Sequence, residues 1–214
     1  MKNKLVIWGA SGHAKVVADI VKLADEYELI GFLDDINLKG AHTELLNLPV
    51  FRGREYLEIL KKQGVRHLLF GFGDCMARLK LSEWIIEEGF LLAKAIHPRS
   101  VIAGGVVIGA GTVVMAKAVV NTGAEIGRNV IINTSAVIEH DCIVQDCVHI
   151  CPGVLLGGGV KVGIAAWVGI GAVVKEKIQI GARSIVGAGS VVINDVSELS
   201  IVYGIPAKKK KKTI

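Results

Sequence analysis

The stretch IAGGVVIGAGTVVMAKAVVNTGAEIGRNVIINTSAVI, residues 102–138, carries an aliphatic residue at every sixth position. The series runs unbroken from Ile102 to Val192, and every member is Ile, Val or Leu although hydrophobic residues make up only 51% of the chain. Four positions after each member comes a small or β-branched residue, such as Val106 or Thr112. A fixed hexapeptide period predicts a parallel β-helix, in which each hexad supplies one short strand and one turn. Three hexads make one triangular coil, so the segment predicts about five coils.

The outward-pointing residues of this β-helix can be sorted by face, because side chains alternate across a strand. The first face carries Val107, Glu125, Ile143, Lys161, Gln179 and Ser197, the second carries Val113, Ile131, His149, Trp167 and Ile185, and the third carries Val119, Val137, Leu155, Val173 and Val191. The first face is mostly polar, whereas the second and third are apolar, and an apolar surface of this size predicts an interface. The segment after Ser197 is too short to cover both. A head-to-tail contact between the second and third faces closes in a three-fold ring, so we expect a homotrimer.

Residues 1–95 have a different rhythm, in which strand and helix alternate. Apolar runs such as KLVIWG, ELIGFLDD and HLLFGFG are separated by segments with helical spacing, such as GHAKVVADIVKLADE. This order predicts a small parallel sheet with helices packed on it, a Rossmann-like α/β domain. The chain is therefore expected to divide into an α/β domain over residues 1–95 and an all-β domain with a C-terminal tail over residues 96–214.

Charge and composition exclude several classes of protein. The net charge is +5, and the run Lys208–Lys212 carries as much alone, so the body is near neutral and no basic stripe indicates nucleic acid. No apolar run approaches the ~20 residues of a membrane span, and the N-terminus does not have the pattern of a signal peptide. We therefore expect a cytoplasmic protein whose cysteines are free thiols. The cysteines are Cys75, Cys142, Cys147 and Cys151.

The segment IEHDCI, residues 138–143, interrupts the aliphatic pattern with charge. His140 falls at the corner where the third face turns into the first, and His149 falls on the second face, so a trimer would bring the two histidines of neighbouring chains into one inter-subunit cleft. A histidine can accept a proton from an amine or hydroxyl that attacks a carbonyl, and a carboxylate, from Glu139 or Asp141, can orient its ring. Backbone N–H groups of residues 157–159, all glycine, could hold the oxygen of a tetrahedral intermediate.

A second polar group lies in the α/β domain. Gly9, Ser11, Gly12 and His13 follow the first strand and open a helix, where backbone N–H groups bind phosphate. Asp34 and Asp35 end the second strand, near the position at which Rossmann proteins bind a ribose. NAD is disfavoured, because GASGHA lacks the third glycine of the dinucleotide motif. A tight strand–helix turn with a helix cap is the alternative to a ligand site.

Five motifs together resemble one protein family. They are GASGHAKVV near the start, FLDD after the second strand, His97-Pro98 at the domain junction, INTSAVIEHDC in the repeats and VYGIPAK near the end. Over nearly its whole length the chain resembles the two-domain bacterial hexapeptide-repeat sugar acetyltransferases of the bacillosamine, perosamine and sialic acid pathways. The resemblance implies a left-handed β-helix, acetyl-CoA as co-substrate and a nucleotide-sugar in the first domain.

The resemblance also assigns roles to individual residues. It implies that His140 is the general base with Asp141 beside it, although some members carry Glu at that position. The other implied contacts are Asn133, Gly12, His13, Asp34 and Asp35 for the acceptor substrate, and His149, Gly158, Gly204, Pro206 and Lys208 for acetyl-CoA. The implied acceptor is the 4-amino group of a nucleotide-linked 4-amino-4,6-dideoxy sugar, and a sialic acid hydroxyl is the alternative. The sequence does not separate UDP, GDP and dTDP.

Two other classes of protein fit the sequence less well. A zinc carbonic anhydrase on the same fold needs three histidine ligands, and the β-helix proper holds only His140 and His149. We therefore expect no metal. A non-catalytic nucleotide-sugar sensor would not need the pair His140–Asp141, which favours an enzyme.

Overall fold

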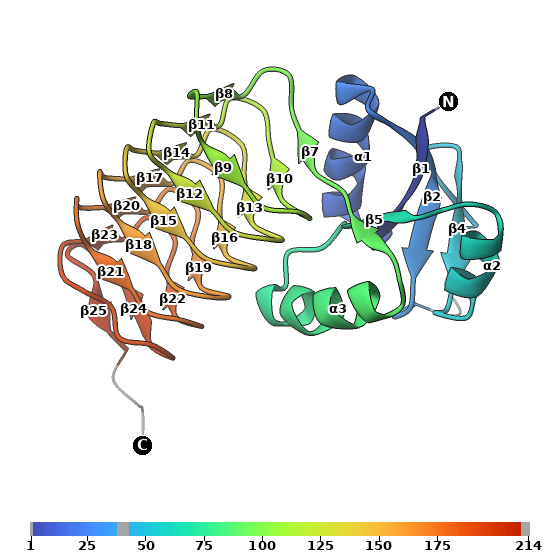
Figure 1. Ribbon diagram of the computed structural model, residues 1–214. Coiled ribbons are helices and arrows are strands. Elements are labelled where there is room, and N and C mark those ends of the chain that lie inside the picture. The colour runs from blue at the N-terminus through green and yellow to red at the C-terminus, as the bar shows by residue number, and fades with distance from the viewer. Residues whose placement is uncertain (1, 38–42, 211–214) are drawn as a thin grey trace.

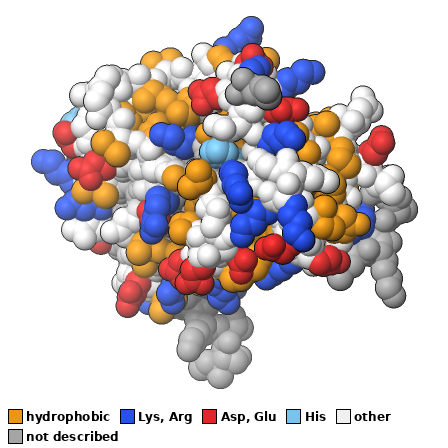
Figure 2. All heavy atoms as spheres, turned by 45° about the vertical axis from the view of Figure 1, so that its right-hand side comes forward, with side chains coloured by type: hydrophobic (Ala, Val, Ile, Leu, Met, Phe, Trp, Pro, Cys, Tyr) orange, Lys and Arg blue, Asp and Glu red, His pale blue; other side chains and the backbone are white. Residues whose placement is uncertain are grey.

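The computed structural model describes residues 2–37 and 43–210, and the chain forms an α/β unit followed by a long stack of coils (Figure 1). Lys211 and Lys212, the end of the lysine run, lie outside the described residues. On the face drawn in Figure 2, basic and acidic side chains are intermingled. Within the described residues, no helix combines the length and hydrophobicity that crossing a bilayer requires.

The α/β unit contains one six-stranded sheet with the strand order β3-β4-β2-β1-β5-β6. Its elements are β1 (Asn3–Trp8), α1 (Gly12–Ala24), β2 (Tyr27–Asp34), β3 (Glu44–Leu45), β4 (Leu48–Arg52), α2 (Tyr56–Lys62), β5 (His67–Phe70), α3 (Cys75–Glu87) and β6 (Leu91–Leu92). All pairs of neighbouring strands are parallel except β3 with β4. The prediction of a small parallel sheet is confirmed. Its central strands β2, β1 and β5 end side by side, so the loops that follow them share one edge.

The strands from β7 to β24 form a left-handed parallel β-helix with three sheets, and β25 pairs antiparallel with β24 at its end. The second-face sheet contains β7 (Ala95–Ile96), β10 (Val113–Val114), β13 (Ile131–Ile132), β16 (His149–Ile150), β19 (Trp167–Val168), β22 (Ile185–Val186), β24 (Ile201–Tyr203) and β25 (Lys208–Lys209). The third-face sheet contains β8 (Val101–Ile102), β11 (Val119–Val120), β14 (Val137–Ile138), β17 (Leu155–Leu156), β20 (Val173–Val174) and β23 (Val191–Val192). The first-face sheet contains β9 (Val107–Ile108), β12 (Glu125–Ile126), β15 (Ile143–Val144), β18 (Lys161–Val162) and β21 (Gln179–Ile180).

The register of these strands follows the hexapeptide period. On the second face, Val113 pairs with Ile131, Ile131 with His149, and His149 with Trp167, so each strand lies over the one three hexads earlier. The aliphatic residues at every sixth position point inward and form one continuous core. The predicted fold class and the assignment of residues to faces are therefore confirmed.

The α/β unit covers the first coils of its own β-helix, which the sequence did not predict. Val17 of α1 packs in one cluster with Val113 and Ile131, and both of these second-face residues are only 1% exposed. The prediction that two apolar faces are free for neighbouring chains is wrong for this part of the second face. The short connection from β6 to β7 folds the first domain back onto the coils. The third face stays open, with Leu155 45% and Val173 39% exposed.

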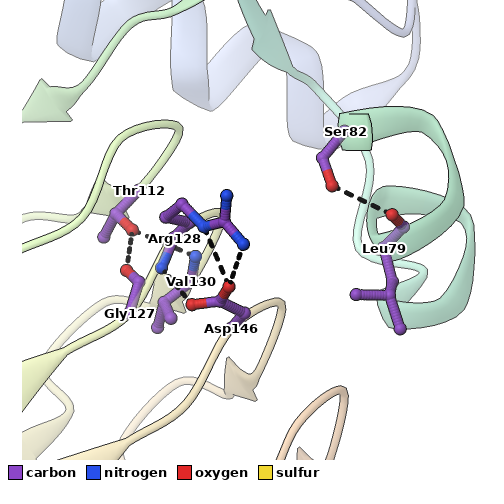
Figure 3. Close-up of polar contacts among 7 residues, drawn as sticks. All are labelled: Leu79, Ser82, Thr112, Gly127, Arg128, Val130 and Asp146. Carbon is purple, nitrogen blue, oxygen red and sulfur yellow. Dashed lines mark hydrogen bonds and ion pairs between the residues drawn. The ribbon is translucent and has the colours of Figure 1, made fainter. Parts of the chain in front are cut away.

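The turns of the β-helix beside α3 are fixed by side-chain hydrogen bonds (Figure 3). The Thr112 hydroxyl donates to the Gly127 carbonyl over 2.8 Å and accepts from the Val130 N–H over 3.1 Å. One coil apart, Arg128 donates from Nε and Nη2 to Asp146 Oδ2 over 2.9 and 2.8 Å. These bonds hold two successive turns in place beside the first domain.

Candidate active site

His140 lies in the turn that joins β14 to β15, at the corner between the third and first faces. Its Nδ1 is 2.8 Å from Asp141 Oδ2. Asp141 adopts a left-handed backbone conformation with φ of 60°, which Asp tolerates better than most residues. When Nδ1 carries the proton and donates it to Asp141, Nε2 is left unprotonated and can act as a base. Both side chains are well exposed, at 61% and 71%.

The structure separates the two carboxylates next to His140. Glu139 Oε2 accepts a hydrogen bond from Asn121 Nδ2 over 2.9 Å, one coil earlier. Asp141 is therefore the carboxylate that contacts the imidazole, a choice that the sequence left open.

Gly158 lies one coil later, directly against the His140 ring. A Cβ at this position would come 2.6 Å from His140 Nε2, so the glycine makes room for the imidazole. The neighbouring N–H groups of Gly157 and Gly159 donate to the carbonyls of Val174 and His140. Among the described residues the Gly158 N–H has no such partner, which leaves it available to a ligand beside Nε2.

A second cluster, defined by His13, Asn133 and His149, lies where the two domains meet. His149 in β16 is only 5% exposed, and its Nε2 is 3.1 Å from Asn133 Nδ2. Its ring centroid is 6.2 Å from that of His13 in the first turn of α1 and 4.3 Å from that of Trp167. Burial, assisted by the positive charge of Arg78, lowers the pKa of His149 to about 3 and that of His13 to about 4. Both imidazoles are therefore neutral near neutral pH.

The two clusters do not meet within one chain. His149 belongs to the second-face sheet, whereas His140 lies at the corner between the other two sheets, across the triangular section. The structure thus brings the predicted residues together in two groups. One group, at the domain junction, is His13, Asn133 and His149, and the other, at the far corner, is His140, Asp141 and Gly158. A cleft shared by His140 and His149 therefore needs two chains, and it stays a prediction.

The predicted nucleotide site lies at the carboxyl edge of the sheet. A cavity of about 610 Å³ opens there beside α3, and it is lined by Trp8, Gly9, Ala10, Ser11, Asp34, Asp35, Ile36, Asn37, Arg54, Phe72, Asp74, Ala77, Lys80, Leu81 and Trp84. Gly9, Ser11, Asp34 and Asp35 were singled out from the sequence. Gly12 and His13 are not among the lining residues, and His13 turns toward the domain junction instead.

The two aspartates of this cavity are held by neighbouring groups. Asp35 accepts from Trp8 Nε1 over 2.8 Å and from Arg54 Nε over 2.7 Å. Asp34 Oδ2 lies 3.1 Å from Arg52 Nη1. Burial raises the pKa of Asp34, but hydrogen bonds from the backbone of Asn37 and Ile36 outweigh it and lower the pKa overall. The aspartates thus position cationic and backbone groups around the cavity.

Sequence reasoning missed the aromatic and cationic part of the cavity. The Arg54 guanidinium carbon lies 5.4 Å from the Trp8 ring centroid and 5.5 Å from that of Trp84, within the range of a cation–π contact. Arg54 follows β4, which pairs with β2, and Asp34 and Asp35 stand at the end of β2. The sequence could therefore have predicted that Arg54 lies beside these two aspartates. Nothing in the sequence indicated that Trp8 and Trp84 line the cavity, because an apolar residue in a strand or a helix is expected in the core.

The predicted coenzyme residues near the C-terminus close the last coil, where Lys208 belongs to β25 of the second-face sheet and its neighbours bond to β23 of the third-face sheet. The Val191 N–H donates to the Gly204 carbonyl over 3.1 Å, and the Ala207 N–H donates to the Val191 carbonyl over 2.8 Å. The segment from β24 to β25, which contains Gly204, Pro206 and Lys208, therefore lies at the end of the β-helix farthest from the α/β unit (Figure 1). Within the described residues, no group of three or more His, Cys, Asp or Glu is arranged to hold a metal ion. The four cysteines are free, as predicted.

Comparison with known proteins identifies the family. Residues 4–85 match the family described as PglD N-terminal domain. Perosamine N-acetyltransferase from Caulobacter crescentus, solved with CoA and GDP-perosamine and with one histidine replaced by asparagine, is 38% identical, with a TM-score of 0.93 over 98% of both chains. The chain belongs to the two-domain family of CoA-dependent sugar N-acetyltransferases.

Two further solved structures share the architecture. The acetyltransferase domain of PglB from Neisseria gonorrhoeae FA1090 is 34% identical, with a TM-score of 0.90 over 98% of this chain and 100% of that one. WeeI from Acinetobacter baumannii AYE is 26% identical, with a TM-score of 0.86 over the same shares. The resemblance drawn from the sequence motifs is confirmed.

Proposed function

We propose that this N-acetyltransferase moves the acetyl group of acetyl-CoA to the 4-amino group of a nucleotide-linked 4-amino-4,6-dideoxy sugar. The observation that carries the proposal is the His140–Asp141 pair, which lies against Gly158, a residue whose N–H has no hydrogen-bond partner among the described residues. The relative solved with CoA and GDP-perosamine, 38% identical along the whole chain, supports the choice of acceptor.

In the proposed reaction, His140 acts as the general base. Its Nε2 accepts a proton from the sugar amine while the amine nitrogen bonds to the thioester carbonyl carbon, and Asp141 holds the imidazolium that forms. The carbonyl oxygen then carries negative charge, and the Gly158 N–H is placed to stabilise it. The intermediate collapses by breaking the C–S bond, so that CoA leaves as a thiolate and takes up the proton from His140.

The two substrates have separate binding regions in this proposal. The nucleotide occupies the cavity of the α/β unit, with its base against Trp84 and its diphosphate at Ser11, beside the N-terminus of α1. The acceptor sugar extends toward His13 and Asn133, and His149 lies where the acceptor meets the thioester end of acetyl-CoA. Acetyl-CoA runs from Gly158 along the third face toward Gly204, Pro206 and Lys208.

The proposed site is shared between chains of a homotrimer. Its third face is exposed and apolar in a single chain, and His140 lies at the edge of that face. Docking this face onto a neighbour would bring His140 to the domain junction of that neighbour, where Asn133 and His149 lie. We place the enzyme in the cytoplasm, where its four buried thiols would stay reduced.

The experiment that tests the function is an acceptor panel. Purified protein is incubated with acetyl-CoA and with GDP-, UDP- and dTDP-linked 4-amino-4,6-dideoxy sugars, and with free and nucleotide-linked sialic acid. Mass spectrometry is expected to show one added acetyl group on an amino sugar, and none with His140→Ala. Acetylation of sialic acid alone would establish the O-acetyltransferase alternative instead.

A further inference from the structure

Arg78, in the first turn of α3, is a buried cation at the domain junction. It is 1% exposed, and among the described residues it makes no ion pair with a carboxylate. A buried charge is costly unless other groups compensate for it. Here the compensation comes from backbone carbonyls of both domains: Nη1 donates to Gly73 over 2.6 Å, Nη2 to Cys147 over 2.8 Å, and Nε to Asn129 over 3.1 Å.

The Gly73 carbonyl links this cation to His149. It accepts from Arg78 Nη1 and lies 3.3 Å from His149 Nδ1, and a carbonyl can only accept, so Nδ1 carries the proton. The other nitrogen, Nε2, then accepts from Asn133 Nδ2. The orientation of the Asn133 amide is fixed from its other end, because Asn133 Oδ1 accepts from the Thr134 N–H over 2.8 Å.

These contacts form one polar chain, Arg78–Gly73–His149–Asn133, from the interior to the rim of the second face. Asn133 donates to His149 and His149 donates to the Gly73 carbonyl, which also accepts from Arg78, so the contacts converge on this one carbonyl. Gly73 and the His149 ring are closely packed, because a Cβ on Gly73 would lie 3.2 Å from His149 Cε1. The same loop carries Phe72 and Asp74, which line the nucleotide cavity.

We propose that Arg78 is a positioning residue for acetyl transfer: through Gly73 and His149 it fixes the Asn133 amide, and through the Phe72–Asp74 loop it fixes the nucleotide cavity relative to that amide. This inference rests on the proposed function. Arg78 contacts neither substrate. Its effect is to hold the acceptor sugar so that the amine nitrogen stays at a constant distance from the thioester carbonyl carbon.

The first test replaces Arg78 by lysine and by methionine. Both variants lose the guanidinium group that donates to three backbone carbonyls. We therefore expect kcat to fall about 10- to 100-fold, the range for a small misplacement of a reactant. The KM for acetyl-CoA is expected to change much less than kcat, because Gly158, Gly204, Pro206 and Lys208 lie elsewhere and His149 is the one predicted coenzyme contact that Arg78 reaches. Nucleoside diphosphate binding, measured by calorimetry, is expected to persist, since Trp8 and Arg54 are untouched.

The pH profile separates positioning from a purely structural role. The titratable and charged groups around His149 are His13 from α1 and Arg78 and Cys75 from α3. Removing the cation in Arg78→Met raises the pKa of His149 and of His13, so kcat is expected to acquire an added loss at acid pH. Arg78→Lys keeps the charge and is expected to lack that added loss.

A second variant keeps the test decisive if the Arg78 variants fold poorly. Gly73→Ala keeps the cation but presses a methyl group on the His149 ring, and it is expected to lower kcat about tenfold or more, with a smaller change in the KM for acetyl-CoA. Gly104→Ala is the control, because a Cβ there meets no atom within 4 Å.

Two results would overturn separate statements. If Gly73→Ala and a folded Arg78→Lys both keep kcat within twofold of the wild type, Arg78 does not position the acceptor, whatever the substrate. If the wild type acetylates none of the nucleotide-linked amino sugars, the proposed function itself is wrong.

Discussion

At the scale of single residues, His140 and its two acidic neighbours allow a matched comparison. Replacing His140 by alanine is expected to reduce kcat by about 10²–10⁴-fold, the usual contribution of a general base. Asp141→Asn is expected to cost less, because it removes the orienting charge and keeps the base. Steady-state kinetics should show a nearly unchanged KM for acetyl-CoA in both, since the loss falls on the transition state.

Glu139→Gln is the control for that series. Its carboxylate binds Asn121 and not the imidazole, and the glutamine can still accept that hydrogen bond. A larger loss of kcat in Glu139→Gln than in Asp141→Asn would show that the wrong carboxylate has been assigned.

Gly158 allows a test that leaves the imidazole in place. In Gly158→Ala the new methyl group would stand 2.6 Å from His140 Nε2, so the ring must move. Because that ring is exposed, we expect little change in the melting temperature but a large loss of kcat. The measurement pairs thermal unfolding with turnover, and Gly104→Ala again serves as the control. Full activity of Gly158→Ala would place the reacting atoms away from Nε2.

His13 and His149 make a prediction about stability and pH. Their folded-state pKa values of about 4 and about 3 lie below the ordinary value of 6.5, so the unfolded chain binds more protons in acid. The free energy of unfolding should therefore be level above about pH 6.5 and fall as the pH drops below it, by about 1.4 kcal/mol per pH unit for each histidine. Urea titrations at several pH values measure this slope, and His149→Gln should reduce it. An unchanged slope would mean that His149 is charged or solvated in the folded protein.

The residue scale is also where the sequence was least sufficient. Glu139 and Asp141 flank the same histidine, and only the stacking of Asn121 one coil away distinguishes them. Arg78 gave no signal, because an arginine in an amphipathic helix is normally solvated. Its burial depends on carbonyls contributed by Asn129 and Cys147, which are distant in sequence.

At the scale of elements, the hexapeptide period predicted nearly all of the β-helix. One coil is three hexads long, so the period sets at once which residues form a strand, which strands pair and which side chains point inward. The alternation of strand and helix likewise predicted the parallel sheet. The docking of α1 on β10 and β13 was not predictable in this way, because it depends on how two separately formed elements meet.

The docking of α1 predicts that two second-face isoleucines contribute differently to the free energy of unfolding. Ile131 is 1% exposed beneath α1, whereas Ile185, three coils on, is 42% exposed. Ile131→Ala should lower the free energy of unfolding by about 2–5 kcal/mol, and Ile185→Ala by clearly less. Denaturant unfolding of both variants checks this, and equal losses would mean that α1 does not cover the second face in solution.

At the scale of the whole molecule, the open third face predicts the assembly. Light scattering should give a mass near 68 kDa, three times 22.7 kDa. Leu155→Glu should yield a folded but inactive monomer, because it places an unpaired charge in the interface. Val107→Glu on the first face is the matched control, since Val107 is 64% exposed and lies outside the proposed contact.

Mixed trimers test whether each site is shared. If His140 of one chain acts on an acceptor held by Asn133 of the next, then His140→Ala and Asn133→Ala chains fail separately but complement each other. A mixed trimer contains junctions at which an intact His140 faces an intact Asn133, so co-refolded mixtures should recover a measurable fraction of wild-type kcat while neither parent does. If both residues served the same site from one chain, every site in the mixture would lack one of them, and turnover would stay at the level of the single variants.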